Sequence, residues 1–216
     1  MSEAPGRGLE RESSLRREAY FSDHYFSYQQ LFSFVHQIKY IVGMKPHSAV
    51  EIGIGNGFVS TFLRRAGIPV LTADINAALE PDICAPLSDL PGLVSEQRDV
   101  VICCEVLEHM PLEELDANLD HLKALGPRLF LTLPNSRKAW GLSGLLHLPK
   151  LGARLFDANI DIPWRRPIEG GPHFWEVGYN SQCTRSGIIR RLKTRYNIVR
   201  SGRFALNPYH IYFICE

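Results

Sequence analysis

The amino-acid sequence lacks an excess of charge of either sign. Its 24 lysine and arginine residues are balanced by 23 aspartate and glutamate residues, so the formal net charge is +1. A protein that mainly coats nucleic acid needs a basic excess to neutralise phosphates, so we do not expect nucleic acid as its principal partner. With 45% hydrophobic and 22% charged residues, the chain also differs from collagen-like, coiled-coil and disordered proteins.

Cysteine is scarce, and its spacing excludes the common cysteine-based sites. The cysteines are Cys84, Cys103, Cys104, Cys183 and Cys215. An odd number, an adjacent pair and the absence of a C-x-x-C spacing argue against both a disulfide framework and a zinc site. We therefore expect free structural thiols in the reducing cytoplasm and no metal among the functional residues.

The sequence also lacks long apolar runs. None reaches the roughly 18 residues that a membrane-spanning helix needs, and the polar N-terminal residues show no apolar signal segment. Residues 1–18 are rich in arginine, glutamate, serine and glycine, and we expect them to form a mobile tail. Residues 19–216 then form one domain, a length that a single hydrophobic core can serve.

Short apolar runs alternate with segments of helical period along the rest of the chain. Buried strands are predicted at 48–53, 70–74, 99–104, 128–133, 197–204 and 209–215, and helices at 56–66, 111–125 and 184–195. Continuous apolar strands separated by helices indicate a parallel sheet with helices on both faces, and we expect the last two strands to form an antiparallel pair. Such sheets bind ligands at the carboxyl ends of their strands.

A glycine-rich turn follows the first predicted strand. Glu51, Gly53, Gly55 and Gly57 have the spacing E-x-G-x-G-x-G at the transition from strand to helix. Glycines let the backbone approach a ligand closely, and a helix N-terminus offers free N–H groups. The dinucleotide spacing G-x-G-x-x-G/A does not fit, because Phe58 occupies its third position. The acid beside the turn repels a pyrophosphate and favours a ligand with a positive charge.

Asp74 provides a second candidate contact to the same ligand. It ends the second predicted strand, where a carboxylate can accept hydrogen bonds from both hydroxyls of a ribose. Taken alone, such an acid could equally be a helix cap or a solvated side chain. In this order on the first two strands, the glycine turn and the acid together indicate a nucleoside ligand.

With these features, the sequence resembles the class I methyltransferases that use S-adenosylmethionine. The resemblance runs from residue 20 to the end of the chain and includes EVLEH at 105–109, LTLPN at 131–135, HFWEVG at 173–178 and NPYH at 207–210. HFWEVG and NPYH are similar to segments of a narrower group of small bacterial and archaeal methyltransferases. The resemblance implies a Rossmann-like α/β fold with a seven-stranded, mostly parallel sheet, helices on both faces and an antiparallel C-terminal strand pair.

The resemblance also implies a set of residues that bind S-adenosyl-L-methionine. These are Glu51, Gly53, Gly55, Gly57, Asp74, Leu87, Glu105 and Val106. The glutamate and glycines of the turn would hold the methionine portion, together with the pair at 105–106, and Asp74 would take the ribose hydroxyls. Leu87 would offer its backbone N–H to adenine. Pro86 stands where many relatives have an aspartate that contacts the adenine amino group, so adenine recognition is expected to rely on backbone and apolar contacts.

Two histidines are the candidate catalytic residues. A sulfonium methyl group is already a strong electrophile, so the protein mainly has to position a nucleophile in line with it. If the acceptor is a hydroxyl, a general base helps, and His173 and His109 lie in the segments where one is expected. Structural roles remain open for both. Glu108 and Glu176 are weaker candidates, and transfer by proximity alone would need no base.

Residues 134–183 break the alternating pattern and are the candidate acceptor-binding lid. The apolar stretch 140–156 is expected to be a lid helix over the site, or else a mouth for a lipid-linked acceptor near a membrane surface. The sequence thus predicts methyl transfer to a small-molecule, glycan or lipid-linked hydroxyl. An RNA or protein methyltransferase and a cofactor-binding regulatory protein without turnover are the alternatives, and the oligomeric state is left open.

Overall fold

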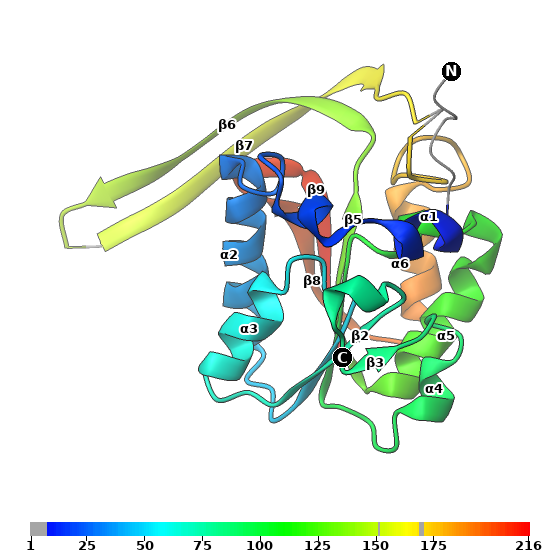
Figure 1. Ribbon diagram of the computed structural model, residues 1–216. Coiled ribbons are helices and arrows are strands. Elements are labelled where there is room, and N and C mark those ends of the chain that lie inside the picture. The colour runs from blue at the N-terminus through cyan, green and yellow to red at the C-terminus, as the bar shows by residue number, and fades with distance from the viewer. Residues whose placement is uncertain (1–7, 151, 169–170) are drawn as a thin grey trace.

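The computed structural model describes residues 8–150, 152–168 and 171–216, and its centre is a seven-stranded sheet (Figure 1). The strand order is β3-β2-β1-β4-β5-β9-β8. The strands are β1 (Ala49–Ile52), β2 (Val70–Asp74), β3 (Ile83–Cys84), β4 (Val100–Cys104), β5 (Arg128–Pro134), β8 (Ile198–Phe204) and β9 (Asn207–Cys215). Strands β1 to β5 pair in parallel, whereas β9 pairs antiparallel with both β5 and β8. The predicted Rossmann-like sheet with its antiparallel C-terminal pair is confirmed.

Helices cover both faces of this sheet, as the continuous apolar strands predict. They are α2 (Tyr28–Gly43) and α3 (Phe58–Arg65) on one face, and α4 (Leu90–Leu93), α5 (Leu115–Leu125) and α6 (Arg185–Lys193) on the other (Figure 1). Two apolar cores result. Ile41 and Leu63 lie in the first and Leu119 and Leu192 in the second, each at most 1% exposed. The buried sheet therefore holds the loops at its carboxyl edge in fixed positions.

The N-terminal segment differs from the predicted mobile tail. Residues 1–7 lie outside the described part of the chain, but α1 (Leu9–Ser14) and the 3₁₀ helix η1 (Arg17–Phe21) follow directly. The side-chain amide of Asn76 donates hydrogen bonds to the carbonyls of Glu12 (3.2 Å) and Leu15 (2.8 Å). These contacts fix the segment beside the end of β2, so residues 8–18 belong to the folded domain.

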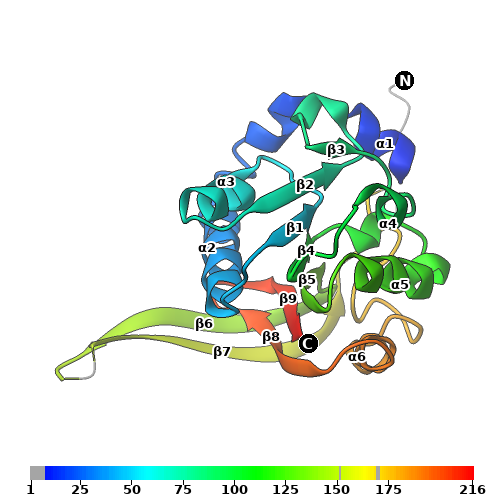
Figure 2. The ribbon, with the colours of Figure 1, turned by 90° about the horizontal axis from the view of Figure 1, so that it is seen from below.

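The insertion after β5 begins as a long hairpin. Strands β6 (Arg137–Leu148) and β7 (Gly152–Arg165) form a separate antiparallel sheet, in which Trp140 pairs with Ile160. Figure 2 shows this hairpin extending past α2, with its tip away from the central sheet. An ion pair of 2.6 Å between Arg203 and Asp161 joins its base to β8. The expectation of a lid helix over residues 140–156 is therefore wrong, because the apolar residues of this stretch lie along two paired strands.

Among the helices of the described residues, none combines the length and the apolar character needed to cross a bilayer.

Candidate functional site

A cavity of about 620 Å³ opens at the carboxyl ends of β1, β2 and β4. Its wall contains seven of the residues that the sequence predicts for cofactor binding: Glu51, Gly53, Gly55, Asp74, Leu87, Glu105 and Val106. Both candidate catalytic residues, His109 and His173, line the same cavity. Gly57 lies just outside, on a smaller adjoining pocket of about 180 Å³, because it caps the N-terminus of α3. The topology thus joins residues that are far apart in the sequence.

The glycine turn adopts a backbone that other residues would strain. Gly53, Gly55 and Gly57 have φ angles of 74°, 53° and 70°, in the left-handed region that favours glycine. A Cβ atom on Gly53 would lie 2.3 Å from Cγ2 of Val106, well inside contact distance. Glycine at this position therefore lets β1 and the turn after β4 approach each other, with the cavity above them.

Glu51 is a charged residue in the middle of a buried strand. Burial raises the pKa of its carboxyl to about 7, and hydrogen bonding to Ser60 only partly offsets this effect. Its Oε2 atom has no hydrogen-bond partner. An ionised carboxylate in such surroundings is costly unless a positive group reaches it. The side chain is therefore suited to a cationic group of a ligand in the cavity.

Asp74 is held at the end of β2 by two backbone donors. Its Oδ2 atom accepts a hydrogen bond from Ile54 N (2.9 Å), and its Oδ1 atom accepts one from Asn76 N (2.8 Å). Burial raises the pKa of this carboxyl, while these backbone donors act in the opposite direction. Each carboxylate oxygen keeps a second lone pair, so the group can still accept hydrogen bonds from a diol. On the adjoining wall, Leu87 is 5% exposed and provides an apolar surface.

Glu105 and Val106 form the turn that follows β4. Glu105 has a φ of 55°, an uncommon backbone conformation for a residue other than glycine. Burial, and repulsion from Glu176, raise the pKa of its carboxyl. Nε2 of His210 lies 3.4 Å from its Oε2 atom. An uncommon backbone conformation and a largely buried acid thus occur together in one turn of the cavity wall, a combination that is common in functional segments.

The two candidate catalytic histidines lie side by side at one end of the cavity. Their ring centroids are 4.9 Å apart, with the rings nearly perpendicular. His109 ends the short 3₁₀ helix η3 (Leu107–His109), and His173 comes from the second half of the insertion after β5. The sequence named both residues but gave no reason for them to meet.

His173 and His109 differ in their surroundings. Nδ1 of His173 lies 3.0 Å from Oε1 of Glu176, which also accepts a hydrogen bond of 2.8 Å from the Tyr209 hydroxyl. This arrangement orients the His173 ring and leaves its Nε2 atom for other contacts. Burial lowers the pKa of His109 to about 4, so this ring is neutral at pH 7. His173 is therefore the better oriented candidate base.

Several lining residues were not among those named from the sequence. They are Arg11 and Glu12 of α1, Tyr20 of η1, Tyr25, and Arg166 after the hairpin. The guanidinium of Arg166 stacks over the Tyr209 ring at 4.2 Å. Aromatic clustering near the N-terminus was the available signal for the tyrosines, but the charged residues of α1 gave none because they have no apolar period.

Comparison with known proteins identifies the fold. No protein-family model and no curated protein matches the sequence. Magnesium protoporphyrin IX methyltransferase from Synechocystis PCC 6803, solved with bound SAH, is 19% identical, with a TM-score of 0.52 over 87% of this chain and 81% of that chain. A S-adenosylmethionine-dependent methyltransferase from Clostridium acetobutylicum ATCC 824 is 12% identical, with a TM-score of 0.55 over 92% and 98%.

A third structural match is the glycopeptide N-methyltransferase MtfA in complex with sinefungin. It is 11% identical, with a TM-score of 0.54 over 84% of this chain and 92% of that chain. Matches at such low identity establish the fold and leave the choice of acceptor open. The chain has the Rossmann-like fold of the S-adenosylmethionine-dependent methyltransferases.

Proposed function

We propose that this protein is a methyltransferase that uses S-adenosyl-L-methionine as methyl donor. One observation carries the proposal: Glu51, Gly53, Gly55 and Asp74 line a single cavity at the carboxyl ends of β1 and β2. The buried acid Glu51 suits the ammonium group of an amino acid, and the glycines let that ligand come close to the backbone. The second acid, Asp74, suits the hydroxyls of a ribose. The solved structures with this fold include complexes with S-adenosylmethionine, SAH and sinefungin.

The residues present fit each part of the donor. The Glu51 carboxylate, with its unpartnered Oε2 atom, would pair with the ammonium of the methionine portion. Asp74 would accept hydrogen bonds from the ribose hydroxyls, and buried Leu87 would border the adenine. Glu105 and Val106 would close the methionine side from the turn after β4. When bound, S-adenosylmethionine supplies a methyl group that is already activated on sulfur.

His173 would act on the acceptor. Its Nδ1–H would donate to Glu176, which leaves Nε2 as the atom that can take a proton from a hydroxyl. His109 would support the ring from the side, since its own lowered pKa makes it a poor proton acceptor. The acceptor would enter under the last part of the 134–183 insertion, which reaches the cavity through Arg166, Pro172 and His173.

The acceptor class we favour is a hydroxyl on a small molecule, a glycan or a lipid-linked molecule. Tyrosines and histidines on the cavity wall suit stacking and hydrogen bonding to such groups, and the net charge of +1 does not suit a general RNA surface. Exposed Trp140, Leu142 and Ile160 on the hairpin are the observation in favour of a lipid-linked acceptor and peripheral membrane contact. All five cysteines are free, in keeping with the proposed cytoplasmic location.

Transfer of a labelled methyl group tests this function. Purified protein is incubated with labelled S-adenosylmethionine and a cell extract, and the products are separated into lipid, RNA, protein and small-molecule fractions. We expect label in the small-molecule, glycan or lipid fraction, and less of it with the Asp74→Ala variant at a donor concentration below that variant's Kd. Label in RNA or protein would contradict the acceptor class. Donor binding without transfer to any fraction would indicate a regulatory protein instead.

A further inference from the structure

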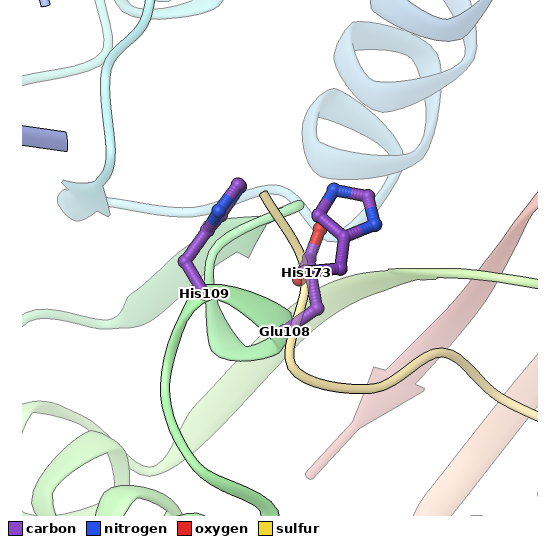
Figure 3. Close-up of side chains that lie close together, drawn as sticks. All are labelled: Glu108, His109 and His173. Carbon is purple, nitrogen blue, oxygen red and sulfur yellow. The ribbon is translucent and has the colours of Figure 1, made fainter. Parts of the chain in front are cut away.

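We propose that Glu108, His109 and His173 bind one divalent transition-metal ion at the acceptor end of the cavity. One ligand atom from each residue lies within 4.8 Å of the others. Figure 3 shows the three side chains gathered together, two from η3 and one from the loop that contains His173. Small side-chain rotations would place each atom at the roughly 2.0–2.2 Å that such ions prefer for nitrogen and oxygen ligands.

Glu108 is the observation that points most directly to a cation. The residue is 0% exposed, and neither of its carboxylate oxygens has a hydrogen-bond partner. Among the described residues no ion pair reaches it, and the nearby Arg11 pairs with Glu12 instead. A buried carboxylate without any donor is rare in folded proteins unless a cation or ligand completes it.

His109 offers a ring nitrogen to the same cluster. A backbone hydrogen bond with Pro172 holds the ring, and its Nδ1 atom makes no hydrogen bond. This atom lies 3.2 Å from Oε1 of Glu12. A cation bound at Nδ1 would lie beside this carboxylate, which Arg11 also contacts.

His173 has the surroundings typical of a metal-bound histidine. In such sites the second ring nitrogen usually donates to a carboxylate or carbonyl, which fixes the ring and increases the basicity of the ligating nitrogen. Nδ1 of His173 meets Glu176 at 3.0 Å, and Glu176 is itself held by Tyr209. His109 has the equivalent arrangement with the Pro172 carbonyl. Each ring is thus held through one of its nitrogens, and its other nitrogen is left for an ion.

The ligand set indicates the kind of ion and its use. Two imidazole nitrogens and one carboxylate oxygen suit Mn²⁺, Fe²⁺, Co²⁺ or Zn²⁺, and leave positions open for a further ligand. This inference rests on the proposed methyl transfer, and in it the bound ion takes the place of Nε2 of His173 in activating the acceptor hydroxyl. An acceptor hydroxyl that coordinates the ion has a lowered pKa and loses its proton to water. The oxygen then bonds to the methyl carbon, the carbon–sulfur bond breaks, and its electron pair stays on sulfur.

Co²⁺ binding to the tag-free, chelator-treated protein tests the site without any need for turnover. We expect one Co²⁺ per chain by titration calorimetry, with visible absorption bands that report nitrogen ligands. Glu108→Gln, His109→Ala and His173→Ala should each weaken binding by about 100-fold or more, and Glu176→Gln by about 10–100-fold through loss of ring orientation. His147→Ala, on the exposed hairpin, is the matched control and should bind Co²⁺ like the wild type.

Two results would overturn the metal site. One is a wild-type protein that binds no Co²⁺, Mn²⁺ or Zn²⁺ at millimolar concentration. The other is an ion that binds equally well to the Glu108→Gln and His173→Ala variants, because it then lies elsewhere. SAH binding, measured in parallel on every variant, confirms that each one is folded. It also separates the two proposals: intact SAH binding without metal binding removes the ion but leaves the methyltransferase function standing.

Discussion

The cavity and the β6–β7 hairpin each depart from the usual arrangement in which charged side chains are exposed and apolar side chains are buried. The cavity buries carboxylates, with Glu51 5% exposed and Glu108 0% exposed, whereas the hairpin exposes Trp140 and Ile160 at 72% each. Buried charge without a partner and exposed apolar surface are both unfavourable in isolation. The extensive burial of apolar side chains that stabilises the fold lies in the two cores of the sheet. The buried acids and the exposed apolar residues are therefore better explained by contact with a ligand or partner than by a contribution to the stability of the fold.

The replacement of His173 has the largest expected effect and tests the acceptor end of the cavity. We expect His173→Ala to lower turnover on the true acceptor by about 10²–10⁴-fold, whether the ring acts as a base or as a metal ligand. SAH affinity should stay unchanged, because the ring lies at the acceptor end of the cavity. Steady-state transfer assays and calorimetry on the same preparation measure the two effects. Normal turnover would make His173 structural and would leave His109 as the remaining candidate.

The hairpin can also be compared with the apolar core of the sheet through one residue type. Trp175 is 2% exposed and donates a hydrogen bond of 3.0 Å from Nε1 to the Met110 carbonyl, whereas Trp140 is 72% exposed. Trp175→Ala should lower the free energy of unfolding by about 3–5 kcal/mol. Trp140→Ala should change it by less than about 0.5 kcal/mol. Urea denaturation measures both, and a large effect at Trp140 would show that the hairpin is packed in solution.

Gly53 tests how closely the turn after β1 approaches the turn after β4. Gly53→Ala adds a Cβ atom 2.3 Å from Val106 Cγ2, whereas Gly67, with a φ of 84°, has nothing within 4 Å of the equivalent position. Both variants carry the strain of a positive φ, about 1–2 kcal/mol. Gly53→Ala should cost about 1–3 kcal/mol more through overpacking. Equal unfolding free energies for the two variants would show that the approach relaxes easily.

Because Glu51 is buried at the donor end of the cavity, we expect both the stability of the protein and donor binding to depend on pH. Its pKa rises from 4.5 to about 7 on folding because the carboxyl is buried. The protonated form is favoured in the folded state, so this contribution to stability is complete below about pH 4.5 and is lost as the pH rises through 7. A cationic donor reverses the preference, so binding near pH 7 should release a proton. Calorimetry in buffers of different ionisation enthalpy measures that proton, and Glu51→Gln should abolish it.

The sheet and the placement of the glycine turn and Asp74 at its carboxyl edge could be predicted because local sequence determines them. The run at 100–104 is apolar throughout, as a strand covered on both faces requires, and Asp74 follows its own strand directly. The glycines at 53 and 55 are required by backbone conformation, which a spacing motif records well. These features depend on neighbours in the sequence, so the pattern alone was sufficient.

The acceptor end and the hairpin could not be predicted in the same way. Glu108 and His173 come from separate segments, and their approach depends on how the insertion folds back over β4 and β5. The expectation of no metal among the functional residues rested on cysteine spacing, so it did not consider the glutamate and two histidines of the proposed site. Residues 140–156 are apolar on both faces of a hairpin, so their period resembles neither an amphipathic helix nor a half-buried strand.

Titration calorimetry with S-adenosylmethionine and SAH tests the central claim most directly. The wild-type protein should bind both at one saturable site per chain. Asp74→Ala should weaken binding by roughly 1–3 kcal/mol through the loss of two buried hydrogen bonds, Asp74→Asn should lose less, and His147→Ala should bind normally. A wild-type protein that binds neither compound, or an Asp74→Ala variant with unchanged affinity, would contradict the donor site that the cavity implies.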